Sequence, residues 1–400
     1  MKIGWVIAAV LTGIAGQASS AGSLGEWQIS GFGTIAGAFA DDQSIALTRG
    51  ALNKPGGGRI DFGPDSIVGL QVNMPLAART DFTLQLRAGE DDKGHVEPTV
   101  GWAFLRQAWT PSLSTRIGRM RVPFFMLSDS LQVNYSNPWV RPPVEVYGLN
   151  PFNDLDGADL LYRLDVWGAE LEVRPYVGRG RVEFAENGSA QLSNAKGINL
   201  TFYFGPLSIH AGHGESRFGL QWGDAQFKQL DAGLQFFGYG NVSRQLAGRD
   251  GYIRFDSLGF QWDDGKWLVS GEYMKRRASR YIASNHAWFA SLGYRVGDWT
   301  PYLTIARQFL DAPMVDQEIA IPGLAEGVRA FNVSRNDAQH STALGVRWDF
   351  ARSMALKAEY SRSRIENGAW GSFFPTSFDD PFALGGKTVN VYSISMDWVF

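Results

Sequence analysis

Arginines and carboxylates are the side chains of this sequence whose spacing could do chemistry without a cofactor. The arginines recur on consecutive segments with strand character: Arg87, Arg106, Arg119, Arg121, Arg163 and Arg174. The carboxylates fall in one segment, 124–157: Asp129, Glu145, Asp154 and Asp156. Facing rows of opposite charge would create an electric field across a water-filled space and act on any solute that crosses it. Alternatively, the two rows pair and hold the segment against a wall, and the sequence leaves both readings open.

Histidines, serines and cysteines offer no catalytic or metal-binding constellation. His340 and Ser341 are adjacent, so on a strand they point to opposite faces. The sequence has 5 histidines, and no pair of them has the helical spacing of metal ligands. Cysteine is absent, which excludes thiolate metal sites and cysteine nucleophiles. We therefore expect no enzyme activity, no cofactor and no metal.

Composition narrows the class of protein further. Apolar residues make up 44% of the 400 residues and charged residues 19%, with 47 glycines and 13% aromatics. A disordered chain would have few aromatics and a high net charge, and a coiled coil would be far richer in charged residues. The formal net charge is only −3, and no sustained basic and aromatic stripe occurs, so we expect no nucleic-acid partner.

The first 21 residues are typical of an export signal. Lys2 precedes an apolar run from Ile3 to Ile14, and small residues follow up to Ala21. A positive charge, a short apolar core and a small-residue end describe a secretory signal peptide, which we assign to residues 1–21. The alternative is a buried N-terminal helix. No later stretch is apolar for the roughly 18 residues that a membrane helix needs.

Alternation with a period of two predicts strands through most of the chain. The pattern is clearest in 158–166, 169–177, 198–204, 342–350 and 354–360. Apolar residues occupy one phase, and charges and hydroxyls the other, as in half-buried strands. The phase of Arg106 is ambiguous, because Val100, Trp102 and Phe104 share it. The strands run for about ten residues, the length that crosses a membrane at a tilt.

Connection lengths separate a membrane barrel from a soluble sandwich. Short turns are expected near 75–80, 111–114, 167–168, 205–206, 263–266, 297–299 and 351–353. Long loops are expected at 39–65, 91–98, 124–157, 178–196, 214–250, 277–285, 310–338 and 364–387. This alternation predicts a closed, antiparallel transmembrane β-barrel of about sixteen strands. Residues 226–239 could form a strand, but we assign them to the fifth loop because a further strand would make the number odd.

Tryptophans and the last strand support the same architecture. Tryptophans gather beside the short turns or near the chain end: Trp109, Trp167, Trp262, Trp267, Trp299, Trp348 and Trp398. An aromatic girdle of this kind is typical of one membrane interface. The final strand is apolar at alternate positions and ends at Phe400. It resembles the signal by which outer-membrane barrels are recognised by the barrel assembly machinery.

The chain resembles Gram-negative porins, specifically a proteobacterial porin-like group. The resemblance covers the organisation of residues 27–400 and is sharpest in Ile117–Phe124, Ser128-Asp129, Pro138–Gly148 and Asp156–Tyr162. It implies a water-filled barrel of sixteen or eighteen strands, commonly a homotrimer, whose third loop folds into the lumen and narrows it. We therefore predict a porin domain over residues 22–400, with 124–157 as the constriction loop.

The expected function is passive diffusion of ions and small hydrophilic solutes across the bacterial outer membrane. The charged residues named above would line the constriction, with weak ion selectivity. Lipid, lipopolysaccharide and the assembly machinery are the expected partners. The alternatives are a substrate-selective porin for one class of small solutes, including anionic ones, and a barrel hydrolase or adhesin.

Overall fold

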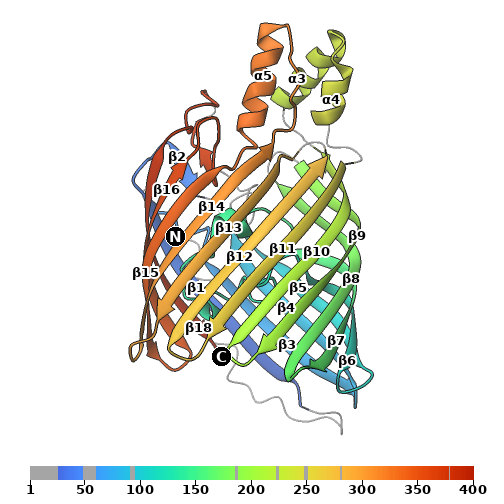
Figure 1. Cartoon of the computed structure of the whole chain (residues 1–400), viewed down its shortest axis with the longest axis vertical. Helices are drawn as coiled ribbons and strands as arrows, with labels where there is room; N and C mark the ends of the chain where they lie inside the picture. The colour runs from blue at the N-terminus through green and yellow to red at the C-terminus, as the bar shows by residue number, and fades with distance from the viewer. Residues whose placement is uncertain are drawn as a thin grey trace.

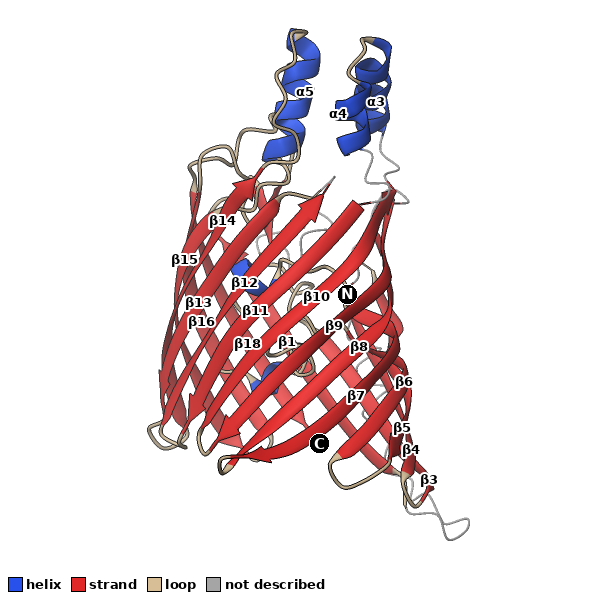
Figure 2. Ribbon diagram, turned by 45° about the vertical axis from the view of Figure 1, so that its right-hand side comes forward, coloured by secondary structure: helices blue, strands red, loops and turns tan. Residues whose placement is uncertain are grey.

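A computed structural model describes residues 26–47, 60–90, 95–184, 188–221, 225–246, 251–279, 282–377 and 379–400. The expected signal peptide, residues 1–21, lies outside the described residues. Sixteen antiparallel strands form one closed barrel (Figures 1 and 2). They are β1 (Gln28–Ala40), β3 (Ile67–Ala77), β4 (Thr80–Glu90), β5 (Val96–Ala108), β6 (Leu113–Arg121), β7 (Asp154–Val166), β8 (Ala169–Phe184), β9 (Gly188–Phe204), β10 (Leu207–Gln221), β11 (Gly251–Asp263), β12 (Trp267–Ser279), β13 (Ser284–Tyr294), β14 (Trp299–Ala312), β15 (Gln339–Ala351), β16 (Met354–Ile365) and β18 (Thr388–Val399).

The last strand closes the barrel on the first. β18 pairs with β1 from Phe32 opposite Val399 to Ala40 opposite Val391. Beyond the strand, Phe400 and Gly31 exchange two backbone hydrogen bonds of 3.0 Å. Closure satisfies the backbone groups that an open edge would leave bare in lipid. The predicted closed barrel with an even number of strands is confirmed.

All of the predicted short turns occur, at one end of the barrel. Among the two-residue turns, the one that joins β7 to β8 consists of Trp167 and Gly168, whose φ angles of 53° and 80° are both positive. The tryptophan girdle lies at this end as well. Trp299 and Trp348 stack there with ring centroids 5.0 Å apart.

The opposite end, called the long-loop end below, carries the longer connections. Three helices rise above it: α3 (Ala225–Phe236), α4 (Gly240–Leu246) and α5 (Pro322–Val333) (Figure 1). They share an apolar cluster that includes Leu234, Leu246 and Val328. The assignment of 226–239 to a loop is therefore confirmed, with α3 in place of a strand. No helix in the described part of the chain is long and apolar enough to cross a membrane.

The prediction of a long loop at 178–196 is wrong. β8 continues to Phe184 and β9 begins at Gly188. The outward phase there carries charged residues such as Arg181 and Glu183, which form an ion pair of 3.1 Å. The strands thus continue beyond their apolar part. Because the outward residues there are charged rather than apolar, the sequence of this part resembled a loop.

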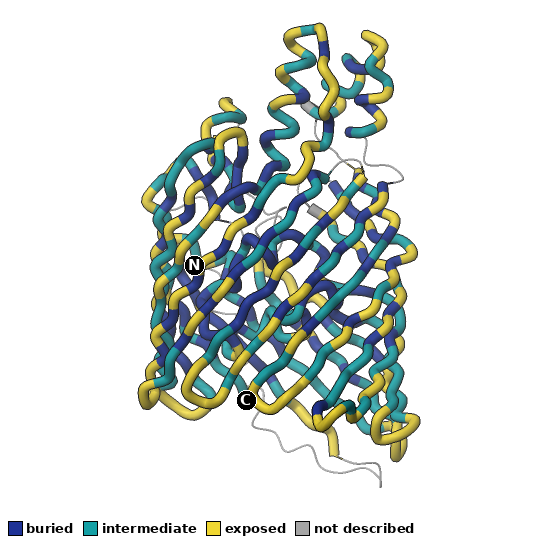
Figure 3. The backbone as a smooth tube through the Cα atoms, in the orientation of Figure 1, coloured by how far each residue is buried: buried dark blue, intermediate teal, exposed yellow. Residues whose placement is uncertain are grey.

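The outer face changes from apolar to charged at the long-loop end of the strands. On β11, Leu258 and Phe260 are 57% and 42% exposed. Arg254 and Asp256 follow in the same outward phase toward the long-loop end. Figure 3 shows exposed and buried residues alternating along the strands. An exposed apolar band bounded by charges is the surface that a lipid bilayer covers.

One segment between β6 and β7 lies inside the barrel. This inner segment, residues 122–153, contains a short 3-10 helix η1 (Asn134–Ser136) and α2 (Val144–Tyr147) (Figure 2). Its apolar side chains share a buried cluster with inward-facing wall residues such as Phe255 and Phe289. The loop predicted at 124–157 therefore runs from 122 to 153.

Candidate functional site

The inner segment is hydrogen-bonded to strands on widely separated parts of the wall. Toward β9, the Asn199 side-chain amide donates to the Pro123 carbonyl at 2.7 Å. Toward β16, Lys357 Nζ donates to the carbonyls of Asn134 at 2.7 Å and Trp139 at 2.9 Å. Because β9 and β16 are not neighbours, these contacts require the segment to cross the interior.

Aromatic side chains fix the segment to the wall at β13 and β14. The Trp139 indole N–H donates to Ser291 Oγ at 3.0 Å and Thr304 Oγ1 at 2.8 Å. Its ring meets Phe289 edge to face, with centroids 5.6 Å apart. Buried indoles need a partner for their N–H, and two hydroxyls from neighbouring strands supply it.

Glu272 on β12 receives two hydrogen bonds from the inner segment. The Met126 N–H donates to Oε1 and the Tyr147 hydroxyl to Oε2, both at 2.8 Å. Burial and the Glu272 carboxylate raise the pKa of Tyr147 well above its usual value, so this phenol stays protonated. Glu272 is 2% exposed, and both donors offset the cost of its burial.

Arginines and carboxylates meet where the inner segment approaches β7 and β8. Arg174 donates to Asp129 of the segment and to Asp159 of β7, each at 2.8 Å. Arg116 also binds Asp159, through two hydrogen bonds. The Asp129 side chain is 46% exposed, and the enclosing protein acts to raise its pKa, but the charges of Arg174 and Arg116 outweigh this effect and hold that pKa below its usual value.

A second charged contact lies nearby on β4. Arg87 donates to Asp154 Oδ2 at 2.7 Å and to Gln132 of the inner segment at 2.5 Å. Arg121 stands 4.0 Å from the other oxygen of Asp154. Arg87, Arg121, Arg174, Asp129 and Asp154 are therefore the predicted residues that the structure brings together around the segment.

Two of the predicted loop carboxylates are wall residues instead. β7 begins at Asp154, so Asp154 and Asp156 belong to a strand. Asp156 pairs with Arg119 in the register that also places Ile117 opposite Ala158. Ala158 lies between Ile117 of β6 and Val177 of β8 in the sheet, and these two side chains are 64% and 56% exposed.

This register puts Arg119 and Asp156 on the outer face, where they are 41% and 43% exposed, so the prediction that they line the lumen is wrong. The reason is a phase that the sequence left unclear, because Arg119 and Arg121 share it with Ile117. The outward arginine is not left alone in lipid, since it makes two hydrogen bonds to Asp156. Arg121 and Asp154 share this phase, but they stand at the ends of β6 and β7, are only 6% and 21% exposed, and Asp154 is bound there by Arg87.

The remaining predicted residues lie apart from the cluster. Arg106 pairs with Asp81 at 2.8 Å and Arg163 with Glu172 at 3.1 Å, and both pairs lie near the short turns. Glu145 is 1% exposed, and Gln339 of β15 donates to it at 2.7 Å. It therefore faces the wall at β15, apart from Arg87, Arg121 and Arg174.

Several charged residues in the barrel interior were not among the predicted site residues. Lys357 and Asp397 form a fully buried pair of 2.8 Å between β16 and β18. Arg141 of the inner segment makes two hydrogen bonds to Asp65. Burial acts to lower the pKa of Arg141, but Asp65, together with Glu359 and Asp61, outweighs it and raises that pKa above its usual value, so the guanidinium stays charged. A signal existed for Lys357, because it lies in the polar phase of an alternating strand.

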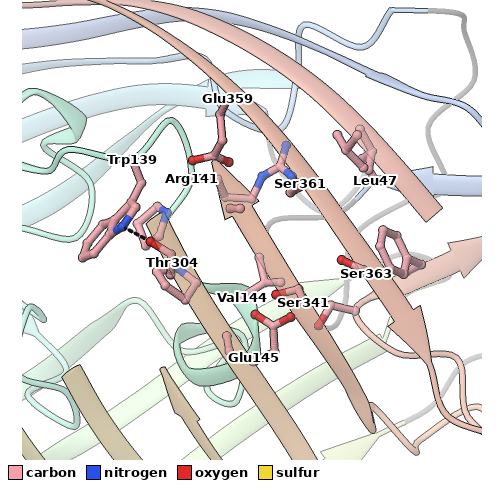
Figure 4. Close-up of a pocket in the computed structure, with 17 residues that line it drawn as sticks. Leu47, Trp139, Arg141, Val144, Glu145, Thr304, Ser341, Glu359, Ser361 and Ser363 are labelled. Atoms are coloured by element: carbon pink, nitrogen blue, oxygen red, sulfur yellow. Dashed lines mark hydrogen bonds between the residues drawn. The ribbon is translucent and has the colours of Figure 1, made fainter. Parts of the chain in front are cut away.

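Two cavities flank the inner segment near β14. The larger, of about 420 Å³, is lined by residues near the short turns, including Arg295, Arg347 and Asp349. The smaller lies toward the long-loop end and is lined by Arg141, Glu145, Glu359 and several serines (Figure 4). Within the described ranges, no cluster of three or more His, Asp or Glu residues is arranged to hold a metal ion.

A sixteen-stranded closed barrel with short turns at one end and a segment folded inside it is the fold of Gram-negative outer-membrane porins. Solved structures of that class share it at low sequence identity. The outer membrane channel DcaP of Acinetobacter baumannii is 14% identical, with 95% of this chain and 100% of that chain covered and a TM-score of 0.53.

OmpF of Salmonella typhi, solved with daunomycin, is 10% identical over 94% of this chain and 97% of that chain, with a TM-score of 0.54. An anion-selective porin from Comamonas acidovorans is 12% identical over 94% of this chain and 100% of that chain, with a TM-score of 0.52. Neither a family model nor the sequence of a curated protein matches the chain. The likeness is one of fold.

Proposed function

We propose that the protein is a non-enzymatic channel that lets ions and small hydrophilic solutes diffuse across the outer membrane. The observation that supports this most is a closed barrel with a polar, charged interior that encloses cavities. A barrel of this size is too wide for wall side chains alone to fill. The arrangement of His340 and Ser341 agrees with a non-enzymatic role, because their phases face opposite sides of β15.

We propose the inner segment as the constriction. Asp129 on the segment faces Arg174 on the wall, and Arg87 and Arg121 surround Asp154. Charges of both signs beside the inner segment would order dipolar solutes there. Because these charges are paired, we expect weak ion selectivity rather than a strong preference for anions.

A substrate-selective channel is the second candidate. The smaller cavity supports it, because the serines Ser341, Ser361 and Ser363 are among the residues that line it (Figure 4). Saturable block of conductance by one class of solute would favour this reading over general diffusion.

The outer face supports a place in the outer membrane, with lipid and lipopolysaccharide as partners. Above the apolar band, Lys196 and Arg254 flank Glu215, and Arg277 pairs with Asp256. Lysine and arginine at this height suit the phosphates of outer-leaflet lipids. We also propose that residues 1–21 direct export and that the strand ending at Phe400 directs assembly. The assembled protein would be a homotrimer.

Planar-bilayer recording of the refolded protein tests the proposal. We expect stable, stepwise ion conductance, and steps in groups of three if the homotrimer is correct. A correctly folded barrel that conducts no ions would refute the channel and direct attention to an adhesin or a hydrolase. Heat-denatured protein serves as the control for leaks caused by detergent.

A further inference from the structure

The two interior cavities share one lining residue of the inner segment, Trp139. Trp139 is 2% exposed. The larger cavity lies on its short-turn side and the smaller on its long-loop side.

The contacts of Trp139 hold the ring across this boundary. Its N–H is shared between Ser291 and Thr304, and Phe289 meets the ring edge to face. Its carbonyl is fixed by Lys357 at 2.9 Å. The backbone is thus anchored independently of the ring, and a rotamer change could move the indole without moving the segment.

The walls on either side suit a particular chemistry. On the short-turn side, Arg295 makes two hydrogen bonds to Asp263, and Arg347 binds Asp349 at 2.7 Å. These charges are paired, so they add no net charge to the path. At the boundary, the Trp139 indole and the hydroxyls of Ser291 and Thr304 are buried and hydrogen-bonded to one another.

The charged groups of the smaller cavity are also partnered. Arg141 binds Asp65, Gln339 donates to Glu145, and the Tyr302 hydroxyl donates to Glu359 at 2.7 Å. The wall then offers serine hydroxyls from β15 and β16 (Figure 4). Hydroxyl groups and an aromatic face are the surfaces that bind uncharged, hydroxyl-rich molecules.

We propose that Trp139 is the gate between the two cavities and sets the upper size of the uncharged, hydroxyl-rich solutes that cross the barrel. This inference rests on the proposed channel function and names a solute class and the residue that limits it. Removal of the indole would join the cavities into one passage. Larger solutes of this class would then cross faster relative to small ones.

Liposome swelling with a neutral monosaccharide, disaccharide and trisaccharide tests the proposal. For Trp139→Ala, the trisaccharide rate relative to the monosaccharide rate should rise at least about threefold, because a side-chain constriction has been removed. Trp348→Ala is the matched control, since that indole stacks on Trp299 on the outer face. It should leave the ratio unchanged.

A second variant covers the case in which Trp139→Ala does not fold. Ser291→Ala with Thr304→Val keeps the indole but removes both of its acceptors, and it should give a smaller rise. A ratio equal to that of the wild type in a folded gate variant would overturn the role of Trp139. A wild-type barrel that swells with no sugar and conducts no ions would instead overturn the channel function itself.

Discussion

Lys357 Nζ lies 2.8 Å from Asp397 Oδ2, and both side chains are completely buried. The two residues come from β16 and β18, and Thr34 of β1 donates to the other oxygen of Asp397 at 2.6 Å. The same ammonium group binds two carbonyls of the inner segment. One ion pair thus joins the closing strands of the barrel to the segment that crosses it.

Replacement of Lys357 by methionine should destabilise the barrel. The change leaves the Asp397 carboxylate buried without its cation, which costs about 3–5 kcal/mol. Urea unfolding in lipid vesicles measures the loss. Lys275→Met is the matched control, because Lys275 is about a third exposed and lies 3.5 Å from Asp311. Equal losses for the two variants would contradict a special role for the buried pair.

Replacement of Arg174 by glutamine should shift ion selectivity toward cations. Asp129 then loses its hydrogen-bonded cation, while Asp159 keeps Arg116. The reversal potential under a salt gradient should correspond to a change of about twofold in the permeability ratio, since one positive charge leaves the constriction. Arg119→Gln should not change the reversal potential, because Arg119 is on the outer face. The opposite ranking of these variants would show that the assigned faces are wrong.

Replacement of Tyr147 by phenylalanine should loosen the inner segment. Glu272 keeps the Met126 N–H but loses the hydroxyl donor, and a buried acceptor that loses a hydrogen bond costs about 1–3 kcal/mol. Denaturant unfolding should show this loss, and limited proteolysis should cut the segment more readily. Tyr360→Phe, which removes a hydrogen bond of 2.8 Å to Asn390 on the wall, should leave segment cleavage unchanged.

The ion pair between Asp129 and Arg174 should be lost only at low pH, when the Asp129 carboxylate becomes protonated. Charge from Arg174 and Arg116 holds the pKa of Asp129 below its ordinary value of 3.8. The stabilisation by this carboxylate is therefore complete above the ordinary value and is lost as the pH falls through the lower folded-state pKa. The stability difference between wild type and Asp129→Asn should stay constant from pH 7 to about pH 4 and shrink below it. A difference that shrinks near neutral pH would contradict the ion pair.

The architecture could be predicted because each level of the sequence agrees. Period-two alternation, short turns such as Trp167-Gly168 and a terminal strand that pairs with the first all specify one closed barrel. The direction in which side chains face could be predicted wherever one face of a strand is apolar. In β16, this identifies Lys357 and Glu359 as inward residues. The same prediction was wrong at Arg119, because both faces of that strand carry polar groups.

The contacts of the inner segment could not be predicted from the sequence. Asp129 and Arg174 lie 45 positions apart, and Gln339 reaches Glu145 across 194 positions. Irregular backbone has no period from which a facing direction can be derived. Trp139 was visible as one aromatic among several, and its role depends on two cavities that only the folded barrel creates.

The central claim is that ions and solutes pass through the interior of this barrel. The chain has no cysteine, so a single introduced thiol can be labelled alone. Ser341→Cys places a thiol at the smaller cavity, while Thr342→Cys places one on the outer face of the same strand. Both variants would be labelled in detergent with a bulky thiosulfonate reagent and then recorded in planar bilayers. We predict that labelling lowers the conductance of Ser341→Cys and leaves that of Thr342→Cys unchanged. Equal effects at the two positions, or no conductance from the unlabelled barrel, would contradict the account.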